Sequence, residues 1–341
     1  MSVLSRPTVL LATASVAAGL LVAPGAAFAA GPAPTLTAAE MKAALKPVAE
    51  ASALAGAGGW RAVTDFSLDV PSAGPITMVD TTVVDPVHGR YSDVVDLGRY
   101  GREETYAAAG EGVHRTVEVG AQTAALRMMG RPAVKYVFTA DKGLELAAFL
   151  VADNAPAPDD MARYYALAGT KTVDEDGTTD FTVLADEGDD PYTVTLHVNA
   201  SSVLTGVDAV PADATEAGEA SIAFTYGAQT VTLPAAAATV DSRTLAKGVA
   251  YLDMAAVVKR AVTKGAADTR KAAKGRTVTV ASLRRLARAG AVSAGKAAGV
   301  AMVQVKDITG GVRVSAVNPW TKKTVAYTVK ASGRQVIVKA V

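Results

Sequence analysis

The residues that could carry acid, base or metal chemistry are few and widely spaced in this sequence. The three histidines are His88, His114 and His197, and none belongs to an H-x-H or H-E-x-x-H pattern of the kind that zinc sites use. Cysteine is absent, which excludes a thiolate nucleophile, a thiolate metal ligand and a disulfide. Neither a G-x-S-x-G elbow nor a complete P-loop occurs. We therefore expect no catalytic residue, no metal site and no cofactor.

Clustered carboxylates are the remaining candidates for chemistry. The runs 174–177 and 186–190 are rich in Asp and Gly, but neither completes a twelve-residue calcium loop with its closing Glu. Hairpin turns explain both runs better. Glu103 and Glu104 are adjacent acids without an indicated cleft. A hydrolase with an unrecognised carboxylate pair stays open as an alternative, and it needs two acids that converge about 5–10 Å apart.

The first 29 residues have the three zones of a cleavable secretory signal peptide. Arg6 precedes an apolar run from Val9 to Ala23, Pro24 breaks that run, and Ala27–Ala29 offers small side chains to a signal peptidase. The run is short for a membrane span. We predict cleavage after Ala29 and a secreted, extracytoplasmic protein. Without cysteine, no lipid anchor is expected.

Charge divides the remaining chain into two parts. Residues 1–240 carry 14 Lys and Arg against 29 Asp and Glu (14 − 29 = −15), whereas residues 241–341 carry 20 against 4 (20 − 4 = +16). More than 300 mature residues also exceed what one core usually organises. The sequence therefore predicts an acidic domain over residues 30–240 and a basic module over residues 241–341.

The acidic domain is predicted to be α+β with one large antiparallel sheet. Thr37 and Glu40 form a capping box for a helix whose apolar face carries Met41, Leu45 and Val48. Alternating apolar residues then indicate strands, and two short helices are expected in the middle, at 143–152 and 160–168. The predicted strands cover 66–70, 76–84, 104–108, 113–119, 133–138, 171–174, 180–185, 192–198, 203–210, 221–226 and 229–233.

This order of elements, with a last hairpin over Ile222–Pro234, resembles the LolA-like superfamily over residues 37–240, and within it the actinobacterial LppX/LprG-type envelope lipoproteins. The resemblance implies a curved sheet that forms a half-barrel, with helices against its concave side. It further implies that the hollow holds acyl chains of a lipid or lipoprotein, without catalytic residues. Those relatives carry a lipobox cysteine that this sequence lacks, so tethering by lipid does not carry over.

Apolar residues that share a face of the predicted strands could line such a hollow. A filled core is the alternative, because any half-buried sheet shows the same alternation. The predicted ligand-binding residues are Phe66, Leu68, Tyr136, Phe138, Tyr192, Val194, Leu196, Ile222 and Phe224.

The basic module is predicted to be a small α+β unit. Helical patterns fall between Gly248 and Ala298 and are interrupted by a Lys- and Gly-rich connector over Lys264–Gly275. Four strands follow, at 300–306, 311–317, 323–330 and 335–341. The cations expected to bind an anionic surface are Arg260, Lys264, Arg284, Arg285 and Arg288.

Cell-wall polymers or phospholipid headgroups are the expected anionic partners of this module. Its docking onto the acidic domain is the alternative. Nucleic acid is not expected, because stacking aromatics are nearly missing and the chain is exported.

The leading hypothesis is a secreted, non-enzymatic protein that binds a lipid or another hydrophobic ligand in the cell envelope. A cell-surface interaction protein that binds anionic wall polymers without a small ligand is the first alternative, and the hydrolase is the second.

Overall fold

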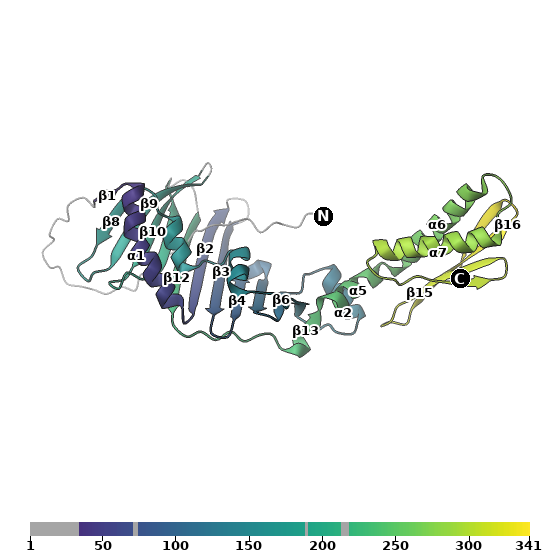
Figure 1. Cartoon of the computed structure of the whole chain (residues 1–341), viewed down its shortest axis with the longest axis horizontal. Coiled ribbons are helices and arrows are strands. Elements are labelled where there is room, and N and C mark those ends of the chain that lie inside the picture. The colour runs from purple at the N-terminus through teal and green to yellow at the C-terminus, as the bar shows by residue number, and fades with distance from the viewer. Residues whose placement is uncertain (1–33, 71–73, 188–189, 213–217) are drawn as a thin grey trace. The chain divides into compact units, whose positions relative to one another are not determined.

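The computed structural model describes residues 34–70, 74–187, 190–212 and 218–341. The predicted signal peptide therefore lies outside the described residues. The chain divides into two compact units, the first made of residues 1–115 and 140–234 and the second of residues 116–139 and 235–341. The second unit thus takes in a segment, 116–139, that the charge balance had grouped with the acidic part (Figure 1).

A large, open and mostly antiparallel sheet of 13 strands dominates the fold. Eleven of its strands form the first unit, in the order β1-β8-β9-β10-β11-β12-β2-β3-β4-β5-β6. Their bounds are β1 Thr35–Leu36, β2 Trp60–Val70, β3 Gly74–Asp85, β4 Arg90–Asp96, β5 Arg102–Ala108, β6 Gly112–Thr116, β8 Gly169–Val173, β9 Thr179–Glu187, β10 Asp190–Val198, β11 Leu204–Pro211 and β12 Gly218–Tyr226.

Three helices, α1 (Ala38–Gly56), α3 (Leu146–Ala152) and α4 (Pro158–Tyr164), pack against this sheet, and a short 3-10 turn, η1 (Gly98–Tyr100), joins two strands. The predicted capping box at the start of α1 is confirmed: the Glu40 amide donates to Thr37 Oγ1 (3.3 Å), and the Thr37 amide donates to the Glu40 carboxylate (2.8 Å). The helix continues through Pro47 and ends at Gly56.

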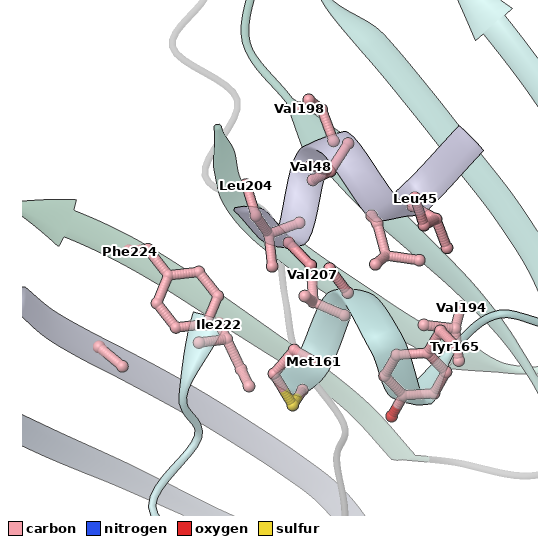
Figure 2. Close-up of a cluster of buried hydrophobic side chains, with 14 of the residues drawn as sticks. Leu45, Val48, Met161, Tyr165, Val194, Val198, Leu204, Val207, Ile222 and Phe224 are labelled. Carbon is pink, nitrogen blue, oxygen red and sulfur yellow. The ribbon is translucent and has the colours of Figure 1, made fainter. Parts of the chain in front are cut away.

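The core of the first unit lies between α1, α4 and one face of the sheet (Figure 2). Leu45 and Val48 project from α1, and Met161 and Tyr165 from α4 and its C-terminal end, toward strand residues that include Val207. Alternate residues of β10 and β12 point into this layer because side chains of a strand alternate between its faces. These strand residues are Val194, Leu196, Val198, Ile222 and Phe224.

Ser52 joins α1 to the sheet by a buried hydrogen bond to Leu204. The buried Leu204 amide donates to Ser52 Oγ at 2.9 Å, and the Tyr226 hydroxyl donates to the Leu204 carbonyl at 2.5 Å. Burial raises the pKa of Tyr226 to about 12, so this hydroxyl keeps its proton at neutral pH.

We expect Ser52→Ala to destabilise the first unit by about 1–3 kcal/mol, because the buried Leu204 amide loses its acceptor. Urea unfolding in a Trp320→Phe background, followed by the fluorescence of Trp60 in the same core, measures the change. Ser201→Ala, at an exposed turn, serves as the control and should stay within about 0.5 kcal/mol. An equal free energy of unfolding for Ser52→Ala and Ser201→Ala would contradict a stabilising role for the Ser52 hydrogen bond.

The second unit contains two clusters of buried residues. One joins α2 (Ala121–Met128) and α5 (Ser242–Leu252) to the parallel strand pair β7 (Tyr136–Ala140) and β13 (Thr239–Asp241), and a 3-10 turn, η2 (Ala236–Ala238), precedes β13. The other joins α6 (Met254–Ala273) and α7 (Val280–Ala297) to a four-stranded antiparallel sheet. That sheet has the order β14 (Gln304–Ile308), β15 (Gly311–Val317), β16 (Thr324–Ser332) and β17 (Gln335–Ala340).

Three sequence-based predictions of local structure are wrong. The expected connector over Lys264–Gly275 is mostly helix, since α6 runs to Ala273. The glycine at position 265 lets α6 pack closely against α7. A Cβ there would lie 2.9 Å from the Ala287 backbone of α7, so only glycine permits this short distance between the helices.

Two expected strands are absent or shorter than predicted. The segment 229–233 is not a strand: the Arg90 guanidinium donates to the Val231 carbonyl, and the side chain of Val231 is buried. The expected strand 113–119 ends at Thr116 as β6, and α2, whose Leu126 packs in the same cluster as Leu245 of α5, follows it.

The predicted fold class, α+β with a large antiparallel sheet and a separate smaller α+β module, is confirmed. Counted by unit, the second carries 23 Lys and Arg against 5 Asp and Glu (23 − 5 = +18) and the first 11 against 28 (11 − 28 = −17). Within the described ranges, no helix combines the length and the hydropathy of a membrane-spanning segment.

Candidate functional site

An open apolar groove of about 510 Å³ lies in the first unit, between α1, α3, the start of α4 and the ends of three strands. Its walls are small and aliphatic side chains, with one aromatic ring. Its lining residues are Ser52, Ala53, Gly56, Ala57, Trp60, Val84, Pro86, Gly89, Ala109, Leu146, Ala147, Leu150, Pro158 and Asp159. A volume of this size falls in the range of about 300–1,000 Å³ that is typical of small-molecule sites.

Two glycines with positive φ set the backbone at this groove: Gly89 lines it, and Gly59 directly precedes the lining residue Trp60. At Gly59 (φ 125°) the chain reverses from α1 into β2, and a Cβ there would lie 2.9 Å from the Gly227 carbonyl oxygen. Gly89 (φ 62°) closes the turn between β3 and β4, and a Cβ there would meet the Ala109 side chain at 3.0 Å. Both positions therefore need a residue without a side chain.

Asp85 holds the turn that contributes Pro86 and Gly89 to the groove. Its carboxylate accepts a hydrogen bond from the His88 amide (3.1 Å) and contacts His88 Nδ1 (2.8 Å). Burial alone raises the pKa of Asp85, but the hydrogen bonds to His88 outweigh it, so the pKa lies below its usual value. The ionised carboxylate thus stabilises this turn at neutral pH.

Tyr91 positions α3 as the opposite wall. Its buried ring packs edge-to-face on Phe149 with centroids 5.4 Å apart, and its hydroxyl donates to Asp153 at the end of α3 (2.9 Å). Burial first, and the nearby charges of Asp93 and Asp153 next, raise the pKa of Tyr91 well above its usual value. The hydroxyl therefore stays a hydrogen-bond donor to α3.

The polar side chains of the groove are already engaged by the protein. Ser52 Oγ accepts from the Leu204 amide, and the Asp159 carboxylate pairs with Arg163 at 2.8 Å. At the mouth, Ala53, Ala57 and Ala147 are exposed. The groove thus offers apolar surface. An apolar chain can bind there without desolvating a charged group that has no partner.

The nine residues predicted to bind a ligand lie elsewhere. Four are buried in the core beneath α1 and α4: Leu196, and Val194, Ile222 and Phe224, which Figure 2 labels. Tyr192 packs at the edge of that core, and Phe66 and Leu68 are half-buried on β2. Tyr136 and Phe138 belong to β7 in the second unit. None of the nine lines the groove.

Sequence reasoning missed the groove because its residues lack a periodic signal. Most of its lining consists of Ala, Gly and Pro at helix ends and turns, such as Gly56 and Pro86. The usable signal was the small-residue run 55–59 at the end of α1. Small residues there leave room between a helix end and a sheet.

The predicted cations of the second unit fall into two groups. Arg284 and Arg288 of α7 pair with Asp307 of β14 at 3.6 and 2.7 Å, so they hold the helix to its own sheet. Lys264 pairs with Asp268 one turn further along α6 (3.2 Å). Arg260 and Arg285 are exposed on α6 and α7.

The acidic candidates do not converge on a site. Glu103 and Glu104 follow each other on β5 and point to opposite faces, and Glu104 accepts from Arg102 and Tyr106. The run 174–177 is a hairpin turn in which the Thr178 hydroxyl donates to Asp176. The side chains of the run 186–190 lie outside the described part of the chain. Among the described residues, no group of three or more His, Asp or Glu could hold a metal ion.

His197 bridges two aspartates on the sheet face opposite the core. Its Nδ1 lies 2.8 Å from Asp180 and its Nε2 lies 3.0 Å from Asp208, on the two neighbouring strands. Burial alone lowers the pKa of His197, but the hydrogen bonds and charges of Asp208 and Asp180 outweigh it and raise the pKa above 6.5.

We expect the stabilisation by His197 to depend on pH. Because its folded-state pKa is above the unfolded value, the contribution is complete below about pH 6.5 and is lost as the pH rises through the raised pKa. The difference in urea midpoint between the natural protein and His197→Gln should therefore be larger at about pH 5.5 than at about pH 8.5. A difference that does not change with pH would show that His197 contributes without its charge.

Comparisons with known proteins leave the family of this chain open. No protein-family model matches the sequence, and no curated protein matches it. Among solved structures, an uncharacterised conserved protein from Thermus thermophilus aligns with 58% of this chain and 99% of its own length, at 9% identity and a TM-score of 0.31. A similarity at that level assigns neither fold nor function.

Proposed function

We propose that the first unit binds the acyl chain of a lipid in the groove between α1 and α3, and that the protein acts as an extracytoplasmic binding protein without a reaction of its own. The observation that carries the proposal is the apolar character of the residues that line the groove. Nearly every residue of the groove is apolar, and the carboxylate of Asp159 is neutralised by Arg163.

Two exposed aliphatic residues directly follow lining residues of the groove in the chain. Leu54, next to Ala53, is 79% exposed, and Val151, next to Leu150, is 74% exposed. Apolar side chains beside an apolar groove extend the surface that a chain longer than the groove would cover.

The energetics suit an acyl chain. Each methylene moved from water into an apolar site contributes about 0.8 kcal/mol. About ten buried methylenes would therefore contribute about 8 kcal/mol, which corresponds to a micromolar Kd before the cost of ordering the chain.

Native mass spectrometry of the purified protein with a long-chain fatty acid tests the proposal. We expect a one-to-one adduct whose abundance rises with chain length, because each added methylene is buried. A short-chain acid such as butyrate is the control and should leave the protein unmodified. Equal adducts with both acids, or none with either, would contradict the proposed function.

A further inference from the structure

The four-stranded sheet of the second unit has one covered and one open face. Helices α6 and α7 pack on the covered face (Figure 1). Val312, Val314 and Ala316 of β15 are buried there. Because side chains of a strand alternate, Arg313 and Ser315 of the same strand lie on the open face.

A row of cations crosses this open face. Strand pairing places Lys306 opposite Arg313, Arg313 opposite Thr328, and Thr328 opposite Lys339. Neighbouring strands lie about 4.8 Å apart, so the row spans about 14 Å across four strands. Lys330, two residues beyond Thr328, adds a fourth cation to the same face. We call Lys306, Arg313, Lys330 and Lys339 the basic row, and all four are exposed.

No carboxylate of these strands balances the basic row. Asp307 is the single acid on the four strands, and it pairs with Arg284 and Arg288 of α7, which packs on the covered face. Among the described residues, no ion pair links the basic row to an acid. Like charges directly opposite each other, such as Lys306 and Arg313, destabilise a sheet. An anionic partner would remove that repulsion.

We propose that the open face docks the second unit onto a bilayer surface that contains anionic phospholipids. Cations mixed with exposed aliphatic residues are typical of surfaces that lie in a membrane interface. Ile337 is 48% exposed beside Lys330, and Val317 is 47% exposed on the same face.

The same residues argue against nucleic acid as the partner. Single-stranded nucleic acid needs aromatic rings on which bases stack. Tyr327 is the aromatic residue of these strands, and it packs toward the helices on the covered face. The basic row is also mainly lysine, which attracts phosphate as a point charge and lacks the planar, bidentate guanidinium that favours arginine in nucleic-acid recognition.

This inference rests on the proposed function for its purpose, because a bilayer is where a protein that binds an acyl chain would find its ligand. The two claims concern different units of the chain. They can therefore fail separately.

Vesicle co-sedimentation of the full chain tests the docking face. Vesicles of phosphatidylglycerol mixed with phosphatidylcholine should bind the protein, and vesicles of phosphatidylcholine alone should not. Each cation near an anionic surface strengthens binding by roughly fivefold. We therefore expect the triple variant Lys306→Gln, Arg313→Gln, Lys339→Gln to weaken binding by about 100-fold.

A control variant removes the same number of charges from the helix faces. Lys259→Gln, Arg260→Gln, Arg285→Gln changes exposed cations of α6 and α7 and should weaken binding less than about fivefold. Circular dichroism and the fluorescence of Trp320 confirm that both variants fold. Equal losses in the two variants would overturn the proposal in favour of diffuse charge attraction.

Two further outcomes separate the remaining possibilities. Absence of vesicle binding, or tighter binding to duplex DNA through the same three residues, would overturn the membrane proposal. Ala147→Trp, which narrows the groove of the first unit, should leave vesicle binding unchanged. If that variant also keeps its fatty-acid binding, the proposed function fails while the docking face stands.

Discussion

Replacing Leu45 by Ala should destabilise the first unit by about 2–5 kcal/mol. Leu45 is 1% exposed on α1 and packs with Val48 and Met161 in the layer between the helices and the sheet. Its truncation removes buried methyl groups and leaves a cavity that the surrounding strands fill only in part. Urea unfolding in a Trp320→Phe background measures the loss, since Trp60 is then the only tryptophan.

The same helix supplies a matched control. Leu54 is 79% exposed, so Leu54→Ala makes the same chemical change without creating a cavity, and we expect a change within about 0.5 kcal/mol. Similar losses for the two variants would mean that helix propensity, and not burial beneath the sheet, sets the stability of α1.

The second large effect concerns the groove. Ala147 of α3 lines its wall, and Ala147→Trp would place a bulky ring where the proposed acyl chain lies. Displacing two or three methylenes costs about 2 kcal/mol, so we expect the Kd for a fluorescent long-chain fatty acid to rise about 30-fold. Fluorescence titration of the purified variant gives this constant.

Ala148→Trp is the matched control on the adjacent residue. Ala148 is exposed on the same helix and does not line the groove. It should bind the fatty acid within about twofold of the natural protein, because its ring points away from the site. Loss of binding in both variants would show that the substitution disturbs α3 as a whole.

The sequence predicts the fold well where local signals agree with tertiary contacts. The capping box at Thr37 and the stripe of Met41, Leu45 and Val48 define α1, and the structure buries all three of these apolar residues. The four strands of the second unit follow the same rule, because their alternation matches a sheet with one covered face.

The sequence fails where contacts distant in the chain decide. Gly265 and Gly290 have low helix propensity, yet both lie inside helices because their missing side chains let α6 and α7 approach each other. Residues 229–233 alternate like a strand but lack a neighbouring strand in the sheet order.

The candidate site was the hardest feature to predict. Apolar alternation identified Val194, Leu196, Ile222 and Phe224, and these residues fill the core between helix and sheet. A groove, by contrast, forms where side chains are too small to fill the space between neighbouring elements. Its small residues come from helix ends and turns that are up to about 100 positions apart, and no periodicity connects them.

A crystal structure of the protein with a brominated long-chain fatty acid would test the central claim most directly. Anomalous scattering locates bromine atoms independently of the protein. The account predicts bromine peaks in the groove, between Ala53 of α1 and Leu150 of α3. Bromine peaks only outside this groove, or none in the first unit at saturating ligand, would contradict it.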